Sequence, residues 1–216
     1  MHKKSEILLI NKYPSLYSLE FIFECGDGWL PLIDVFSSLL ISCSENTIIE
    51  YVKEECGHLS IQLNGYSDAD YFYVFGLSSM AYSLSELICD QCGNRGYIYN
   101  CSGIINSRCE VHGGYPIGQS RSEISPHVPF NLNHIGVAWS EIISNLYLHV
   151  VFHVRENKMP PVTFNSIETR DGQLVIDFSG GGDEAMQGTV DLLLAYTLLI
   201  DEYTGKLLNP LNDVEK

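Results

Sequence analysis

Apolar residues recur at helical spacing from Trp29 to Ser42, and two alternating segments follow. The spacing of the apolar positions predicts an amphipathic helix that tolerates Pro31 in its first turn. Residues 47–53 and 58–63 alternate like strands, and Cys56-Gly57 between them has the composition of a turn. A second helical pattern runs from Tyr71 to Ile88. The first half therefore predicts a helix, a hairpin and a helix in that order.

The same order recurs in the second half of the chain. Gly136-Val137-Ala138-Trp139 and a helical pattern repeat Gly26-Asp27-Gly28-Trp29 and its helix, 110 residues later. Residues 172–180 match 57–65, and residues 197–205 match 85–93. The helical segment 190–200 is almost wholly apolar, which indicates burial on more than one side. We therefore predict an α+β fold of two related helix–hairpin–helix units packed as a pseudo-dimer.

A stretch rich in glycine, proline and serine separates the two predicted units. It leaves little periodic apolar surface to bury, which is typical of a linker. The predicted division is a unit at 1–113, a linker at 114–133 and a second unit, a degenerate repeat, at 134–216.

The first unit ends in a CxxC, Cys89 and Cys92, followed after sixteen residues by a CxxH, Cys109 and His112. Three thiolates and an imidazole at this spacing can close a tetrahedron around one Zn2+, which predicts a zinc knuckle. Four protein ligands leave no open position, so this metal is expected to be structural. The alternatives are a redox dithiol, unliganded thiols, or Cys101 as a ligand in place of Cys109. The second unit has Asp201 and Thr204 where the CxxC would be, so it is expected to be metal-free.

Residues 20–113 resemble a family of small, mostly uncharacterised proteins from bacteria, prophages and phages. Three segments carry the resemblance: an acidic opening at 23–29, a hairpin at 51–59, and a CxxCG at 88–93 with the later CxxH. The chain departs from the family at His58, Ser60 and Gln62, where a basic or aromatic hairpin face is usual. The resemblance implies a zinc-stabilised α+β module and no established reaction.

Charge limits the kinds of partner. The 216 residues include 12 Lys and Arg against 27 Asp and Glu, a formal net charge of −15. Such a surface repels phosphate backbones, so direct nucleic-acid binding is disfavoured and a basic protein partner is favoured. Seven cysteines without a secretion signal favour the reducing cytoplasm. Neither long apolar segment, 190–200 or 142–154, is long enough for a membrane span.

Residues that could act as catalysts are sparse. His149 and His153 are four apart on one predicted helix, but Val150 stands where an HExxH motif needs glutamate. Gly180-Gly181-Gly182 precedes two carboxylates and lacks the GK[ST] of a phosphate-binding loop. We therefore expect a protein that is not an enzyme.

Two functions follow as hypotheses. The first is a protein-binding factor, such as an immunity or inhibitor protein against a basic toxin or nuclease, or a phage antagonist of host defence. Its contact residues would be loop carboxylates, Asp68, Asp70, Asp183 and Glu184. The alternative is a zinc-ribbon regulator of nucleic-acid machinery, which would use Arg95, Tyr97, Tyr99 and Arg108 around the zinc loop.

Overall fold

The computed structural model describes residues 1–44, 46–101, 103–113, 128–156, 158, 161–180 and 184–209, and for Asn100 and Cys101 the backbone alone. Helices and strands follow in the order α1 (Lys3–Lys12), β1 (Phe23–Glu24), η1 (Asp27–Trp29), α2 (Leu30–Cys43), β2 (Ile48–Glu55), β3 (His58–Asn64), α3 (Tyr71–Ser85), β4 (Tyr97–Cys101), β5 (Ile104–Arg108), α4 (Val137–Glu156), β6 (Thr163–Arg170), β7 (Gln173–Ser179) and α5 (Glu184–Thr197). The protein is thus mixed α+β, with several small sheets.

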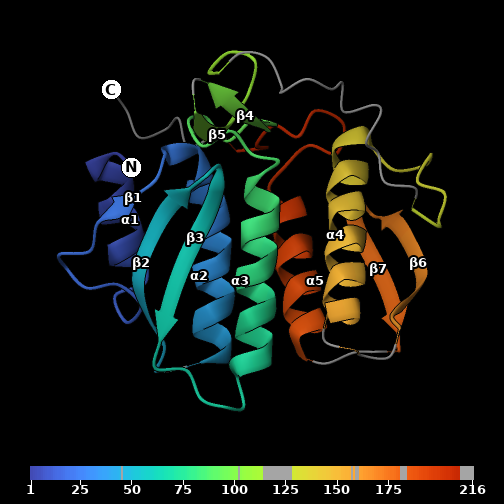
Figure 1. The fold of residues 1–216 in the computed structure, drawn as a ribbon, viewed down its shortest axis with the longest axis horizontal. Coiled ribbons are helices and arrows are strands. Elements are labelled where there is room, and N and C mark those ends of the chain that lie inside the picture. Colours follow the sequence, from blue (N-terminus) through green and yellow to red (C-terminus); the bar gives the residue numbers. More distant parts are fainter. Residues whose placement is uncertain are drawn as a thin grey trace.

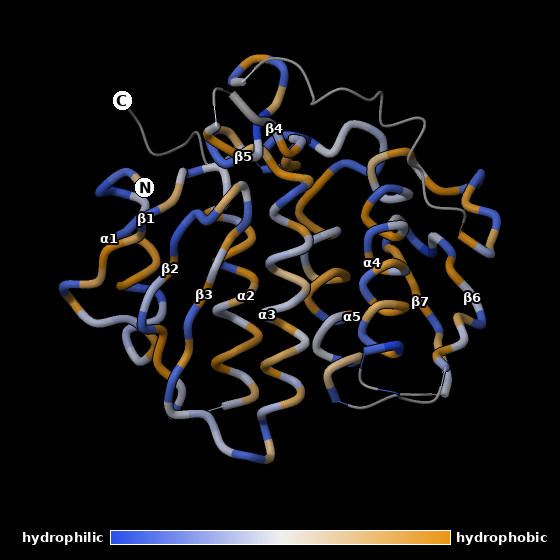
Figure 2. The backbone as a smooth tube through the Cα atoms, viewed as in Figure 1, coloured by the Kyte–Doolittle hydropathy of each residue, from blue (hydrophilic) through white to orange (hydrophobic). Residues whose placement is uncertain are grey.

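The four long helices stand between two sheets (Figure 1). The sheet β1-β2-β3 lies beside α2 and α3, the hairpin β6-β7 lies beside α4 and α5, and the hairpin β4-β5 lies beyond the end of α3. Apolar segments run along the helices in the middle of the molecule (Figure 2). Buried side chains from both halves of the chain form one hydrophobic cluster, so the two halves share a core.

Helix α3 crosses α5 at two glycines. A Cβ atom on Gly76 would lie 2.0 Å from the carbonyl oxygen of Ala185, and one on Gly188 would lie 2.3 Å from that of Tyr73. Only glycine permits backbones to approach this closely. The crossing therefore holds the two halves together with direct contact between helix backbones.

Backbone geometry also corresponds between the halves. Both hairpins have a register shift near their first pairs, between Ile49 and Tyr51 in one and between Phe164 and Ser166 in the other. After α3, the Cys89 amide donates to the carbonyl of Asn94 at 2.8 Å. After α5, the Asp201 amide donates to the carbonyl of Lys206 at the same distance.

The sequence predicted most elements but misplaced some of their ends. Helix α3 stops at Ser85 rather than Ile88, because Ile88 leaves the helix to pair with Arg95 in an isolated bridge. Helix α5 begins at Glu184, six residues before the apolar segment that predicted it. Leu198, expected to be buried, is half exposed because it lies beyond the end of α5.

The pairing of short strands was not predicted. β1 pairs in parallel with β2 although it has only two residues, and β4 pairs with β5 between the two cysteine pairs. Most of the predicted linker, 114–127, lies outside the described residues. None of the helices in the described ranges is both long and apolar enough to cross a membrane.

Candidate metal centre

The four predicted metal ligands come together beyond the end of α3. Cys89 and Cys92 lie on the turn that follows this helix, and the hairpin β4-β5 returns the chain to Cys109 and His112. All four donor atoms lie within 4.8 Å of one another. Cys89 and Cys109 are buried, Cys92 is half buried and His112 is exposed. These residues could bind a metal ion.

The spacing of the donor atoms fits a tetrahedron. The Sγ atoms of Cys92 and Cys109 are 3.7 Å apart, and the Cys89 Sγ is 3.6 Å from the Nδ1 of His112. Zn–S bonds of about 2.3 Å and a Zn–N bond of about 2.0 Å give tetrahedral edges of about 3.5 to 3.8 Å. These two distances match such edges, while the Cys109 Sγ is 3.3 Å from the His112 Nδ1 and all four donors lie within 4.8 Å of one another.

The turn that carries Cys89 and Cys92 is tight. The Gly93 amide donates to the carbonyl of Cys89 at 2.9 Å, and Gly93 has a φ of 73°, which favours glycine. On the other side, the amides of His112 and Gly113 both donate to the carbonyl of Cys109 at 3.0 Å. Each ligand pair is thus held by its own tight turn.

The Gly-Asp-Gly-Trp segment before α2 packs against the turn that carries Cys89 and Cys92. The Gly28 amide donates to the carbonyl of Asp90 at 2.7 Å, and the Trp29 indole donates to the carbonyl of Ile88 at 3.1 Å. A Cβ on Gly28 would lie 2.1 Å from the carbonyl oxygen of Cys89. Glycine at 28 and tryptophan at 29 are therefore explained by their contacts with the ligand turn, 59 or more residues further along the chain.

Two arginines near the site are paired with carboxylates. Arg108 forms an ion pair with Asp90, whose side chain is buried, and Arg95 forms one with Glu141 on α4. Both belonged to the predicted nucleic-acid contact set. Because their charge is already balanced within the protein, they offer little net attraction to a phosphate backbone.

Cys92 and Cys109, whose Sγ atoms are 3.7 Å apart, differ in acidity. Burial raises the pKa of the Cys92 thiol to about 12. Burial also acts to raise the pKa of Cys109, but hydrogen bonds from the His112 backbone and side chain and from the Val111 backbone outweigh it and leave the pKa at about 7. Since metals bind thiolates, loading this site would displace protons from its thiols.

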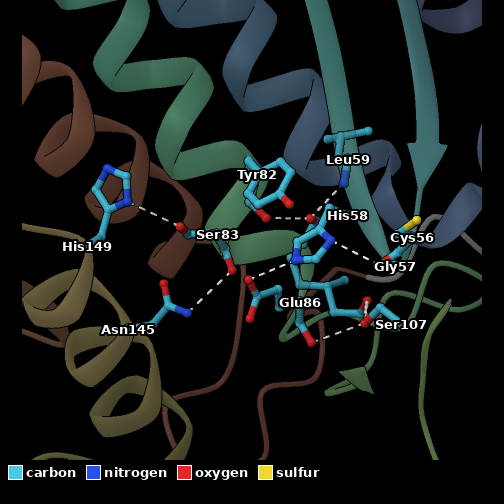
Figure 3. Close-up of polar contacts among 12 residues, drawn as sticks. Cys56, Gly57, His58, Leu59, Tyr82, Ser83, Glu86, Ser107, Asn145 and His149 are labelled. Carbon is cyan, nitrogen blue, oxygen red and sulfur yellow. Dashed lines mark hydrogen bonds and ion pairs between the residues drawn. The ribbon is translucent and has the colours of Figure 1, made fainter. Parts of the chain in front are cut away.

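A second polar cluster, which the sequence did not predict, joins the first hairpin to the end of α3 (Figure 3). The His58 ring stacks on Tyr82, with centroids 4.1 Å apart, and its Nε2 is 3.0 Å from the Glu86 carboxylate. Its Nδ1 is 3.0 Å from the carbonyl of Cys56. Both ring nitrogens therefore face acceptors, which favours the doubly protonated ring. The Glu86 carboxylate raises the pKa of His58, although burial acts to lower it.

The remaining histidine candidates do not assemble a metal site. His149 is largely buried, its Nδ1 lies 3.3 Å from the Ser83 hydroxyl (Figure 3), and burial lowers its pKa to about 4. The His153 ring lies 5.7 Å from that of Phe75. Among the described residues, the cluster at Cys89 is the single group of three or more potential ligands in reach of one ion.

The structure places three of the four predicted partner contacts. Asp68 and Asp70 precede α3, and Glu184 begins α5 next to Ala185, whose carbonyl oxygen approaches Gly76 of α3. These three carboxylates therefore belong to the same end of the helix pair. Asp183 and the glycines at 181 and 182 lie outside the described residues, as does the side chain of Cys101.

In the second half, an acidic side chain occupies the position that corresponds to Cys89. The Oδ1 of Asp201 accepts hydrogen bonds from the Thr204 amide at 2.7 Å, the Thr204 hydroxyl at 2.8 Å and the Tyr203 amide at 3.2 Å. Gly205, with a φ of 67°, closes this turn as Gly93 closes the other. Hydrogen bonds thus hold this turn in the second half.

A hollow of about 830 Å³ lies between the start of α1 and the metal site. Its charged and polar lining includes His2, Lys3, Asp27 and Cys92. His2 pairs with Asp27, and Lys3 pairs with Glu6 at 3.2 Å. The His2–Asp27 pair joins the start of α1 to η1, whereas Lys3 and Glu6 pair within α1 itself.

Comparison with known proteins returned no match. No protein-family model matches the chain, and no curated protein and no solved structure matches it either.

Proposed function

We propose that this chain is a non-enzymatic cytoplasmic protein that binds a basic protein partner and is stabilised by one structural zinc ion. The proposed partner is a toxin, a nuclease or a defence protein, so the chain would serve as an immunity factor, an inhibitor or a phage antagonist of host defence. The observation that carries the proposal is a cluster of four potential metal ligands, three cysteines and one histidine, in a chain of net charge −15.

Zinc is proposed from the donor set. Thiolates and imidazole in a tetrahedron select zinc over calcium or magnesium, which take oxygen ligands. With four protein donors no coordination position remains for water or substrate, so the ion would stabilise the fold. The CxxC and CxxH spacing in the sequence supports the same assignment.

The charge supports a basic partner. An acidic surface attracts a basic protein over long range and increases its association rate. The ion pairs of Arg95 and Arg108 weaken the alternative, a zinc-ribbon regulator of nucleic-acid machinery, because they neutralise the cations that such a regulator would use. A gel-shift assay with generic DNA and RNA separates the two functions.

We further propose that the two halves arose by duplication and pack as a pseudo-dimer. The matching hairpin irregularities, the matching turns after α3 and α5, and the reciprocal glycine contacts at Gly76 and Gly188 support this. A two-fold relation explains why each glycine meets the helix of the other half. Folding of residues 134–216 alone as a soluble monomer would contradict the pseudo-dimer.

The metal assignment is tested by elemental analysis of purified protein. About one zinc per chain is expected, and Cys109→Ser should lose both zinc and several kcal/mol of folding free energy. Cys56→Ser is the matched control, because Cys56 is an exposed free cysteine on a hairpin turn. Absence of zinc, with all thiols reactive, would contradict the assignment.

The partner assignment is tested by affinity purification from the native host or from phage-infected cells. A basic protein should be recovered, and added salt should weaken its binding. Neutralising Asp68, Asp70, Asp183 and Glu184 together should weaken it as well, because these carboxylates are the proposed contacts. Binding that is indifferent both to salt and to these substitutions would refute the electrostatic mechanism.

A further inference from the structure

An exposed group of aromatic side chains lies on the first half of α3. Tyr71, Phe72 and Phe75 are 45%, 50% and 40% exposed, and Tyr71 is in ring contact with both phenylalanines. The group reaches α4, because the Phe75 ring lies 5.7 Å from that of His153, which follows the 64% exposed Phe152. We call Tyr71, Phe72, Phe75 and Phe152 the aromatic face.

The packing of α3 against α5 does not depend on the aromatic face. If the duplication holds, Gly76 corresponds to Gly188, so Phe72 and Phe75 correspond to Glu184 and Gln187 on α5. Both of these are exposed and polar. The same helix crossing therefore exists with a polar surface in the second half. Three exposed aromatic residues on α3 of the first half, with Phe152 of α4 beside them, reduce solubility without a gain in core packing, which is typical of an interaction site.

Carboxylates border the aromatic face. Asp68 is exposed and Asp70 directly precedes Tyr71. Hydrogen bonds from Ser67 and Ser44 lower the pKa of Asp70, so it is ionised at neutral pH. Glu184 is also close, because Ala185 contacts α3 at Gly76. The cationic residue on α4 nearest in sequence to Phe152 is Arg155.

We propose that the aromatic face binds an apolar segment of the basic partner that carries arginine. A guanidinium group stacks on aromatic rings and also forms forked hydrogen bonds with carboxylates, so it suits this combination better than an ammonium group. Exposed rings with an acidic border have the composition of a binding hot spot for such a group. This proposal depends on the proposed function only in that the partner is a basic protein.

The test uses the full chain and a fluorescent peptide of about 14 residues with Arg and Leu at helical spacing. Fluorescence anisotropy should show binding to the wild type, and the double substitution Phe72→Ser and Phe75→Ser should weaken binding on the order of tenfold or more. The peptide with Lys for Arg should bind more weakly, and the peptide with Gln for Arg should bind weakest.

A matched control removes a similar apolar area elsewhere. Ile41 and Leu198 are 40% and 50% exposed, and replacing both with Ser should leave peptide affinity unchanged. Circular dichroism and zinc content verify that both double variants are folded. No binding to the wild type, equal binding by the Gln peptide, or equal loss in the control variant would overturn the proposal.

Three further outcomes distinguish an error in the proposed surface from an error in the proposed function. If a basic partner recovered from the host binds the Phe72→Ser, Phe75→Ser variant as well as the wild type, the surface is wrong and the function stands. If sedimentation shows a wild-type dimer that this variant dissolves, the face is covered by a second copy and the proposal is overturned. Failure to recover any basic partner would remove the proposed function, whatever the peptide does.

Discussion

At the scale of single residues, the hydrogen bonds of the His58 ring depend on whether the ring is protonated. Both ring nitrogens lie 3.0 Å from oxygen acceptors, the Cys56 carbonyl and the Glu86 carboxylate. A neutral imidazole has one N–H and can satisfy one of them, whereas the charged ring satisfies both. The contact thus joins the first hairpin to the end of α3 most strongly when His58 is protonated.

This arrangement predicts a stability difference that depends on pH. Because the folded-state pKa of His58 is raised, its contribution is fully present below the unfolded pKa and is lost as pH rises through the folded pKa. Urea unfolding should show the wild type more stable than Glu86→Gln by about 1 kcal/mol at about pH 5.5, with a smaller difference at about pH 9. Comparing the two proteins cancels the effect of pH on the metal ligands. A difference that stays constant across this range would contradict the charged ring.

At the scale of elements, two turns of the same shape are held by different chemistry. The turn after α3 ends at Gly93 and carries metal ligands, while the turn after α5 ends at Gly205 and is held by hydrogen bonds to Asp201. Under the proposed function, the first turn binds a zinc ion, whereas the second is held by the hydrogen bonds of Asp201.

The two turns should therefore respond differently to a chelator. Removing the metal should lower the unfolding midpoint of the wild type markedly, since binding energy at such sites contributes to folding. Asp201→Ala should lower the midpoint by the same amount with and without chelator, because its hydrogen bonds do not involve the metal. Asp201→Asn, which keeps an acceptor oxygen, is the matched control. Thermal unfolding followed by circular dichroism measures all of these, and a chelator effect that vanishes in Asp201→Ala would contradict the independence of the turns.

What the sequence could predict at this scale depends on distance along the chain. The metal ligands were predictable because each pair lies within one turn, and the hairpin β2-β3 was predictable because alternation and a turn occur in one short segment. His58 with Glu86, and Arg95 with Glu141, are 28 and 46 residues apart. No local pattern marks such pairs, since β3 must first pack against α3, and α4 beside the segment after α3, to bring the partners together. The end of α3 was misplaced for the same reason, because the apolar Leu87 and Ile88 continue the helical pattern while their backbone serves the ligand turn.

At the scale of the whole molecule, the crossing of α3 and α5 decides whether the protein unfolds as one body. The buried residues form a single cluster across both halves, and the two helices meet backbone to backbone at Gly76 and Gly188. A side chain at either glycine would push the halves apart. Stability of the half that contains the Cys89 cluster should therefore depend on residues in the other half.

Substitutions at the crossing test this dependence. Gly76→Val and Gly188→Val should each destabilise the protein by about 3 kcal/mol, because their Cβ atoms would overlap carbonyl oxygens of the other helix. Gly172→Ala is the control: it has a φ of 75° and open space around it, so about 1 kcal/mol is expected. Urea unfolding should remain a single transition in all three. Separate transitions for the two halves would show that each folds without the other.

The two tryptophans make these events visible separately. Trp29 and Trp139 are both buried, one beside each of the two turns, since Trp29 bonds to Ile88 and the Trp139 amide bonds to the carbonyl of Glu202. The Trp29 indole has a hydrogen-bond partner, whereas the Trp139 indole nitrogen has none among the described residues. Their emission should therefore differ in wavelength. A paramagnetic or coloured ion exchanged into the cysteine site would quench Trp29 first, so each half of the molecule carries its own intrinsic optical probe.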